Sequence, residues 1–264
     1  MNALQAGAAF LPNRVVSRAT VRMLIAVQVA ILLIVWWTAP FAVLPRPEEV
    51  AVAFQSLWFS QGLGRELITS VLMNLEAIGL TLLISLTLTY LTVLPVFRPI
   101  AAAVSKGRFL GLVGLTLAFT LVVGGGRPLK VSLLVFGMTV FFVTSMAEEV
   151  AQIPKDKFDH ARTLRMSEWE VVSEVVILGT ADKAIEVLRQ NAAIGWMMLT
   201  MVEGISRSEG GVGAMLLNQN KHFHLAEVFA IQFTILAVGL TQDYGIGLFK
   251  RLLCPYAALT LERR

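Results

Sequence analysis

The sequence contains few charged residues, one cysteine and no recognisable phosphate-binding loop. Charged residues make up 15% of its 264 positions, whereas soluble domains usually have about 25%. The single cysteine, Cys254, excludes an internal disulfide framework and a cysteine-cluster metal site. The G-x-x-x-x-G-K-[ST] loop that cradles nucleotide phosphates is absent. These absences exclude an ordinary soluble domain and a nucleotide hydrolase of the phosphate-loop type. We expect no catalysis, no bound cofactor and no metal site in this chain.

Long apolar runs occupy most of the remaining sequence. Hydrophobic residues account for 56% of the chain, and the mean hydropathy is +0.72. A membrane-spanning helix needs about 20 mostly apolar residues. Uninterrupted apolar runs exclude a barrel, whose strands would alternate polar and apolar positions. We therefore predict an all-α polytopic membrane protein with about six spans, at 23–44, 68–97, 109–126, 129–147, 184–204 and 225–249.

The distribution of Lys and Arg predicts the orientation of these spans. Basic residues are enriched in cytoplasmic loops. With both termini inside, the external segments contain only six of the 22 Lys and Arg residues. The prediction is a cytoplasmic tail (1–22), a membrane domain (23–250) that includes a cytoplasmic loop (148–182), and a second cytoplasmic tail (251–264). The first run is too long for a signal peptide and is interpreted as an uncleaved span.

The charged stretch FDHARTLRMSEWE, residues 158–170, lies within this cytoplasmic loop. Phe158, Ala161 and Leu164 are spaced i, i+3 and i+6, which predicts a short apolar stripe on a helix. Ser167 and Glu170 form the S-x-x-E signature of a new helix start. The pattern predicts two short helices with a break near Arg165–Met166. From the pattern alone they are either a solvated loop or a docking element for a soluble partner.

Polar side chains inside apolar runs are candidates for a solute pathway, because they are costly in a membrane. Glu76 could instead serve interhelical bonding, and Glu186 with Arg189 reads as an interfacial ion pair at i, i+3. The candidate pathway residues are Asn74, Glu76, Thr200 and Glu203.

The charged stretch resembles the EAA loop of bacterial ABC-importer permeases, which reads E-A-A, three residues, G, nine residues, then I-x-L-P. Asp159 stands at the Glu, His160–Ala161 at the two alanines, Arg165 at the Gly and Leu178 at the Pro. LPRPEEV (44–50) is similar to the L-P-x-P-x-x-V entry of the nitrate/sulfonate/taurine subfamily. MVEGISRSEGGVGAML (201–216) is similar to the subfamily's A-E-M, glycine-rich stretch. The resemblance covers about residues 22 to 255, but the subfamily's proline-rich stretch around the third span is missing.

This resemblance implies the permease subunit of an ATP-driven importer of a small polar or anionic solute, in a bacterial inner membrane. It implies a second permease chain, in a homodimer, and cytoplasmic ATPase subunits that carry ATP and Mg. It also implies an external solute-binding protein and surrounding lipid, with no role for nucleic acid. The implied coupling helix and ATPase interface comprise Phe158, Asp159, His160, Ala161, Arg162, Thr163, Leu164, Arg165, Ser167 and Trp169.

Two departures keep alternatives open. An arginine at the glycine position either adopts a left-handed conformation, at a cost of about 1 kcal/mol, or the turn has a different shape. Arg165 and the missing prolines also fit a divergent subunit with an assembly or regulatory role. An ATP-independent secondary transporter is a weaker alternative, because we find no repeat between the two halves of the chain.

Overall fold

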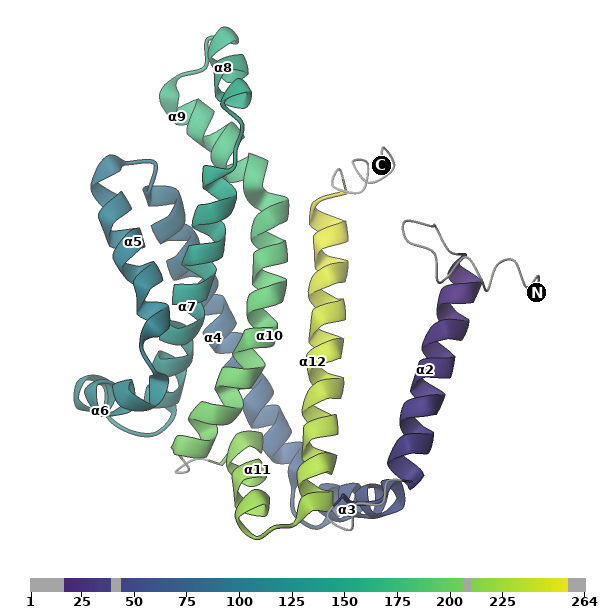
Figure 1. Ribbon diagram of the computed structural model, residues 1–264. Coiled ribbons are helices and arrows are strands. Elements are labelled where there is room, and N and C mark those ends of the chain that lie inside the picture. The colour runs from purple at the N-terminus through teal and green to yellow at the C-terminus, as the bar shows by residue number, and fades with distance from the viewer. Residues whose placement is uncertain (1–16, 39–43, 207–209, 256–264) are drawn as a thin grey trace.

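The computed structural model describes residues 17–38, 44–206 and 210–255. Across these ranges the chain forms helices and turns and contains no strand (Figure 1), which confirms the all-α prediction. Residues 1–16 and 256–264 of the two predicted tails lie outside the described residues, as do 39–43 of the first predicted span.

Four helices are long and apolar enough to cross a membrane. They are α2 (Arg18–Thr38), α4 (Leu63–Leu91), α7 (Arg127–Ala151) and α12 (Leu225–Leu253). The predicted fifth span is α10 (Ala181–Ile205), which has 25 residues. Its charged residues, such as Asp182, Glu186 and Arg189, keep its hydropathy below that of the other four. The structure therefore supports a multi-pass membrane protein with four candidate spans, or five if the bent pair described next is counted as one span. The six predicted spans are not confirmed.

The predicted third span, 109–126, is not a straight spanning helix. The chain leaves α4 through η1 (Pro95–Phe97), α5 (Arg98–Lys106) and η2 (Gly107–Phe109), and then turns into α6 (Leu112–Val123). The helical segments 95–109 and 112–123 are bent by 119° relative to each other, and α6 has only 12 residues. Gly111 is extended, with φ −73° and ψ 128°, and Gly124 has φ +82°, so both ends of α6 are broken by glycine backbone. This bent pair counts as a fifth span only if it is taken as one broken crossing.

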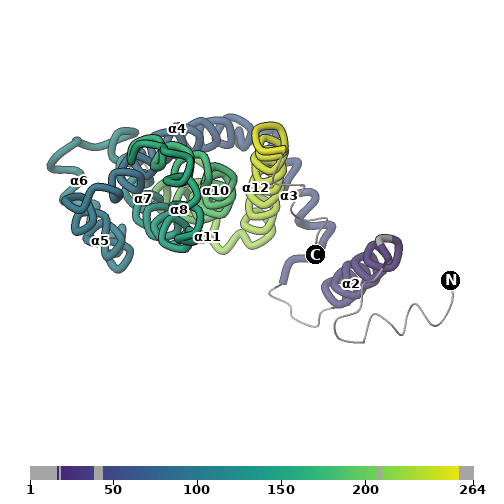
Figure 2. Tube along the Cα trace, turned by 90° about the horizontal axis from the view of Figure 1, so that it is seen from above, coloured from purple at the N-terminus to yellow at the C-terminus, as the bar shows by residue number. Residues whose placement is uncertain are grey.

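The helices α4, α7 and α10 form the centre of the molecule, and α12 lies beside α10 (Figures 1 and 2). Their shared core is apolar, and the helices approach closely at Gly195. A Cβ there would lie 3.0 Å from the Met138 Cε atom and 3.1 Å from the Asn74 Oδ1 atom. Fully buried core side chains include Met73, Leu133, Leu134, Met138, Phe142 and Leu199.

The helix α2 stands apart from this bundle in both views (Figures 1 and 2). Its attachment is aromatic: the Trp36 ring lies 6.4 Å from the Phe229 ring and 5.8 Å from the Phe233 ring of α12. Between α2 and α4, the chain forms the helix α3 (Pro47–Phe59), which buries Val50, Ala53 and Leu57. Pro47 opens α3 at the first turn, where its missing N–H has no intrahelical role.

Two short helical segments lie at opposite ends of the bundle (Figure 1). At one end, α8 (Lys155–Thr163) and α9 (Glu168–Val171) project beyond the long helices. The chain then continues through the π-helical segment η3 (Val172–Ile177) and the 3₁₀ segment η4 (Leu178–Thr180) into α10. At the other end, α11 (Val212–Lys221) packs between α10 and α12.

Candidate functional site

The projecting segment, residues 155–171, contains the helix–break–helix that the sequence predicts. Pro154 precedes α8, and Ala161 is buried while Phe158 is partly buried. The predicted apolar stripe does not extend to Leu164, which is the C-cap residue and is 60% exposed.

The turn between the helices, residues 163–167, is called the arginine turn below. Its backbone is a Schellman motif: the Arg165 N–H donates to the Arg162 carbonyl at 2.9 Å, and the Met166 N–H donates to the Ala161 carbonyl at 3.4 Å. Arg165 has φ +60°, the left-handed conformation that glycine usually supplies. The turn has therefore kept the glycine shape, at a cost of about 1 kcal/mol for the arginine.

The predicted capping box is also present. The Ser167 N–H donates to Glu170 Oε2 at 2.7 Å, and the Glu170 N–H donates to Ser167 Oγ at 3.4 Å. The Ser167 hydroxyl also donates to Glu170 Oε2, at 2.8 Å, and the two bonds donated by the Ser167 N–H and hydroxyl hold the pKa of the Glu170 carboxyl below its usual value. The second helix is thus started by its own side chains.

A two-point ion pair connects the two short helices across the turn. The Arg162 Nε and Nη2 atoms donate to the two carboxylate oxygens of Glu168 at 3.1 and 3.3 Å. The hydrogen bond and charge of Arg162 lower the pKa of Glu168. Trp169, which follows, is 69% exposed. The projecting segment is therefore shaped by local contacts and presents two large apolar side chains, Leu164 and Trp169.

The projecting segment is joined to α10 without a break in helical structure, because η3 and η4 fill residues 172–180. Thr180 ends this stretch with its hydroxyl donating to the Val176 carbonyl at 2.7 Å, and it lies 3.3 Å from the Tyr90 hydroxyl of α4. Leu178, at the position where the resemblance expects a proline, is inside η4. The segment is thus connected by helical backbone to a helix of the bundle centre.

The four candidate pathway residues lie in different surroundings. Asn74 is buried and donates to the Gln242 Oε1 atom at 3.1 Å, an oxygen that also accepts from Trp196 Nε1 at 2.8 Å. Glu76 is exposed and forms an ion pair with Arg127 at 2.5 Å. Residues two positions apart lie on different faces of a helix, which is why Asn74 is buried in the core while Glu76 is exposed.

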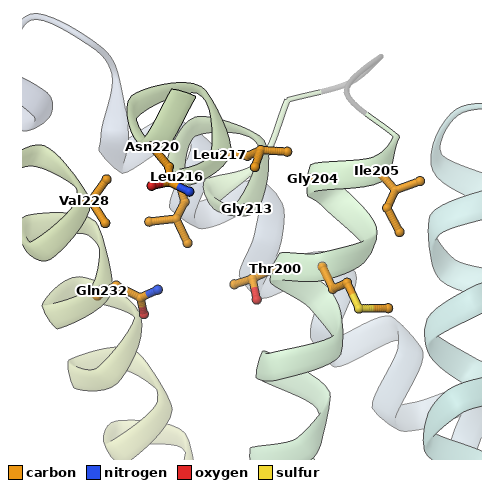
Figure 3. Close-up of a pocket in the computed structure, with 10 residues that line it drawn as sticks. Thr200, Gly204, Ile205, Gly213, Leu216, Leu217, Asn220, Val228 and Gln232 are labelled. Atoms are coloured by element: carbon orange, nitrogen blue, oxygen red, sulfur yellow. The ribbon is translucent and has the colours of Figure 1, made fainter. Parts of the chain in front are cut away.

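Thr200 lies at a pocket of about 410 Å³ near α11, here called the α11 pocket (Figure 3). Helices α10, α11 and α12 form its walls. In Figure 3, Thr200 of α10 and Gln232 of α12 face the space between these helices. Its polar side chains are neutral: Thr200, Asn220 and Gln232. The remaining lining residues are Met201, Gly204, Ile205, Gly213, Leu216, Leu217 and Val228.

Glu203 is not among the residues that line this pocket and is fully buried. Its carboxylate accepts from Ser70 Oγ at 2.6 Å and from the Gly213 N–H at 2.8 Å. The Ser70 hydroxyl oxygen in turn accepts from the Val212 N–H at 2.9 Å. Through these contacts Glu203 holds the start of α11 against α4 and α10.

Sequence reasoning missed the other members of this cluster. Lys130, fully buried on α7, donates from Nζ to the Gly210 carbonyl at 2.9 Å. The Glu66 carboxylate accepts from the Gly211 N–H. Gly210 and Gly211 have φ +71° and +106°, and a Cβ at Gly211 would overlap the Glu203 carboxylate. The run of glycines was the signal available in the sequence, because such backbone needs glycine and leaves room for a buried partner. Residues 210–213 are called the glycine turn below.

The ion pair predicted between Glu186 and Arg189 is present at 3.7 Å and belongs to a longer chain of charges. Arg189 binds the Asp243 carboxylate of α12 through two bonds of 2.6 and 3.1 Å. Glu186 accepts from Lys250 Nζ at 2.8 Å. These contacts join α10 to α12 in the halves nearest the projecting segment.

Comparison with known proteins identifies relatives in one class. The bicarbonate transport system permease protein CmpB of Synechocystis sp. is 26% identical over 123 residues, 44% of this chain and 44% of the relative. This chain is related to transport permeases. CmpB of Synechococcus elongatus is also 26% identical, over 119 residues. No family model matches the chain.

These relatives, which are named bicarbonate transport permeases, confirm the predicted resemblance to an ABC-importer permease in divergent form. The matched region spans less than half the length of the curated relatives. Together with the apolar helices, they support a multi-pass protein of the bacterial inner membrane.

Proposed function

We propose that this chain is the permease subunit of an ATP-driven importer, and that its projecting segment binds a cytoplasmic ATPase subunit. The observation that carries the proposal is the α8–α9 unit, which presents exposed Leu164 and Trp169 and continues as helix into α10. Side chains of this size on an otherwise polar projection favour a partner surface, since tryptophan is enriched at the centres of interfaces.

In the proposed mechanism, the ATPase moves the projecting segment and the movement reaches α10 through η3 and η4. A ligand shifts a conformational equilibrium only if it binds the two states differently. The ATPase therefore has to hold Leu164 and Trp169 differently in its nucleotide-bound and nucleotide-free forms. ATP and Mg belong to that subunit in this proposal, and a second permease chain and an external binding protein complete the complex.

The proposed solute is a small hydrogen-bonding anion such as bicarbonate. Two observations support it: the named function of the CmpB relatives, and the neutral polar groups of Thr200, Asn220 and Gln232 in the α11 pocket. The Asn and Gln amides and the Thr hydroxyl can donate hydrogen bonds to an oxyanion. A neutral site releases an anion more easily than a site with a buried Lys or Arg, as a transport pathway requires.

Docking is tested by co-purification of the full chain with its ATPase subunit in detergent. Replacement of both Leu164 and Trp169 by Asp should abolish co-purification, because it removes the apolar contacts and adds two charges to the contact surface. The matched control is Phe223→Asp, a change of an 83% exposed aromatic side chain in the turn after α11. Equal recovery of ATPase with the double variant and with the control would contradict the docking proposal.

A second candidate is a divergent complex subunit with an assembly or regulatory role. The sharp bend between α5 and α6 favours it, because it leaves only four or five candidate spans in the described residues, whereas the sequence predicts six. The two candidates separate in reconstituted vesicles that contain the ATPase and the external binding protein. A permease gives ATP-dependent uptake of labelled bicarbonate that falls at least severalfold in Gln232→Leu. An assembled complex that shows no solute-stimulated ATP hydrolysis supports the second candidate.

A further inference from the structure

The arginine turn leaves one charge without a partner inside the chain. Four charged residues lie between positions 162 and 170, and three of them bind each other or the backbone: Arg162 with Glu168, and Glu170 with Ser167. Within the described part of the chain, the Arg165 side chain forms no hydrogen bond or ion pair. Arg165 is also exposed, so its guanidinium is available to another molecule.

The fold itself does not explain an arginine at this position. Arg165 occupies the left-handed residue of the Schellman motif, and the two backbone bonds of that motif need only its N–H group and that of Met166. Glycine would make the same bonds without strain. Strained backbone of this kind clusters at functional sites, so an arginine at this position points to a role for its side chain.

The neighbours of Arg165 indicate the kind of surface that it meets. Leu164 precedes it and is 60% exposed, and Trp169 is 69% exposed on the first turn of α9. Trp and Arg are the residue types that dominate interface energetics. A guanidinium beside two apolar side chains fits a groove that has an apolar floor and a carboxylate at its edge, because Arg pairs with carboxylates through two parallel bonds.

We propose that Arg165 binds an acidic side chain of the ATPase subunit, and that this contact selects the ATPase that fits this permease. The proposal rests on the proposed function, since it names the chemistry of the same docking surface. Its distinguishing consequence is that one substitution has opposite effects. Arg165→Gly relaxes the turn and stabilises the permease, but weakens the complex.

The test measures binding of the ATPase subunit that co-purifies with the wild-type chain, in nanodiscs, at several salt concentrations. We expect Arg165→Gly and Arg165→Gln to raise Kd roughly tenfold at low salt. Both should flatten the dependence of Kd on salt, and Arg165→Glu should raise Kd further. The unfolding midpoint of Arg165→Gly should stay equal to wild type or rise. The matched control is Arg251→Gln, which removes an exposed positive charge from the last turn of α12 and should leave Kd unchanged.

Three results would overturn the inference while leaving the proposed function intact. The first is an Arg165→Gly variant that binds the ATPase subunit with the same Kd and the same salt dependence as the wild-type chain. The second is an equal change with Arg251→Gln, which would show a general effect of charge. The third is an effect of Arg165 that appears only in nanodiscs with phosphatidylglycerol and not in those of phosphatidylcholine, which would assign the arginine to lipid. Failure of the wild-type chain to bind any ATPase subunit would instead remove the proposed function itself.

Discussion

The glycine turn and the arginine turn use the same left-handed backbone in opposite ways. In the glycine turn, Gly210 and Gly211 have positive φ, and buried groups from α4, α7 and α10 bind the backbone. In the arginine turn, a non-glycine residue takes the positive φ, and only neighbours in sequence hold it. The first is bound to the bundle from several sides, whereas the second projects from it.

This difference separates a structural turn from an exposed one that is available for contact. A turn fixed by the buried side chains of Glu203, Ser70 and Lys130 cannot move without breaking bonds that have no replacement in an apolar environment. A turn fixed by its own Schellman bonds and capping box keeps its shape wherever the segment moves. Substitutions in the two turns should therefore differ in size and in what they affect.

The largest effect is expected from removal of the Glu203 carboxylate. Glu203→Ala leaves Ser70 Oγ and the Gly213 N–H without their acceptor and removes a negative charge that interacts with Lys130. The free energy of unfolding should fall by roughly 3–5 kcal/mol, as for a broken buried charge network. Chemical unfolding in detergent micelles measures it. The control Glu76→Ala, which breaks an exposed pair with Arg127, should cost less than about 1 kcal/mol. An equal loss of unfolding free energy in Glu203→Ala and Glu76→Ala would contradict the claim that buried contacts hold the glycine turn.

The next effect concerns the space around Gly211. Gly211→Ala combines a positive φ of 106° with an overlap between the new Cβ and the Glu203 carboxylate. We expect a loss of roughly 3 kcal/mol in the same unfolding assay. Gly62→Ala separates the two causes, because Gly62 has φ +73° but open space around it. Its expected cost is only about 1 kcal/mol.

A smaller effect is expected in the arginine turn. Ser167→Ala removes the side-chain acceptor of the Glu170 N–H and should destabilise the start of α9 by about 1 kcal/mol. The change should be local, so hydrogen exchange should speed up at residues 168–171 and stay unchanged at Val212 and Gly213. Ser173→Ala, at an exposed serine in η3, is the matched control. Faster exchange at the glycine turn would show that the two ends are coupled.

The smallest effect is the response of the arginine turn to acid. The folded pKa values of Glu168 and Glu170 lie below the ordinary value of 4.5, so their stabilising contribution is complete above that pH. It is lost as the pH falls through the folded values. Exchange at residues 168–171, corrected for its intrinsic pH dependence, should therefore accelerate below about pH 4.5. The double variant Glu168→Gln, Glu170→Gln should lose most of this acceleration.

Local patterns predicted the projecting segment well because its structure is local. The break at Arg165 and the capping box at Ser167 each depend on residues a few positions apart. The bend in the third span could not be predicted, because an apolar run does not show that the chain changes direction at Gly111. The partners of Glu203 were equally out of reach, since Ser70 and Glu203 are 133 positions apart.

The π-helical segment η3 gives the chain a place where its helical register can change. From Glu168 to Ile205 the chain is helical throughout, and only η3 and η4 depart from the α-helical pattern. A π turn holds one residue more than an α turn. If η3 lost that extra residue and became α-helical, α9 would rotate by about 100° relative to α10. Trp169 would turn with α9, and residues 152–154 would have to absorb the change, because they join the same segment to α7. The face that the projecting segment presents therefore depends on whether this single turn is π-helical or α-helical.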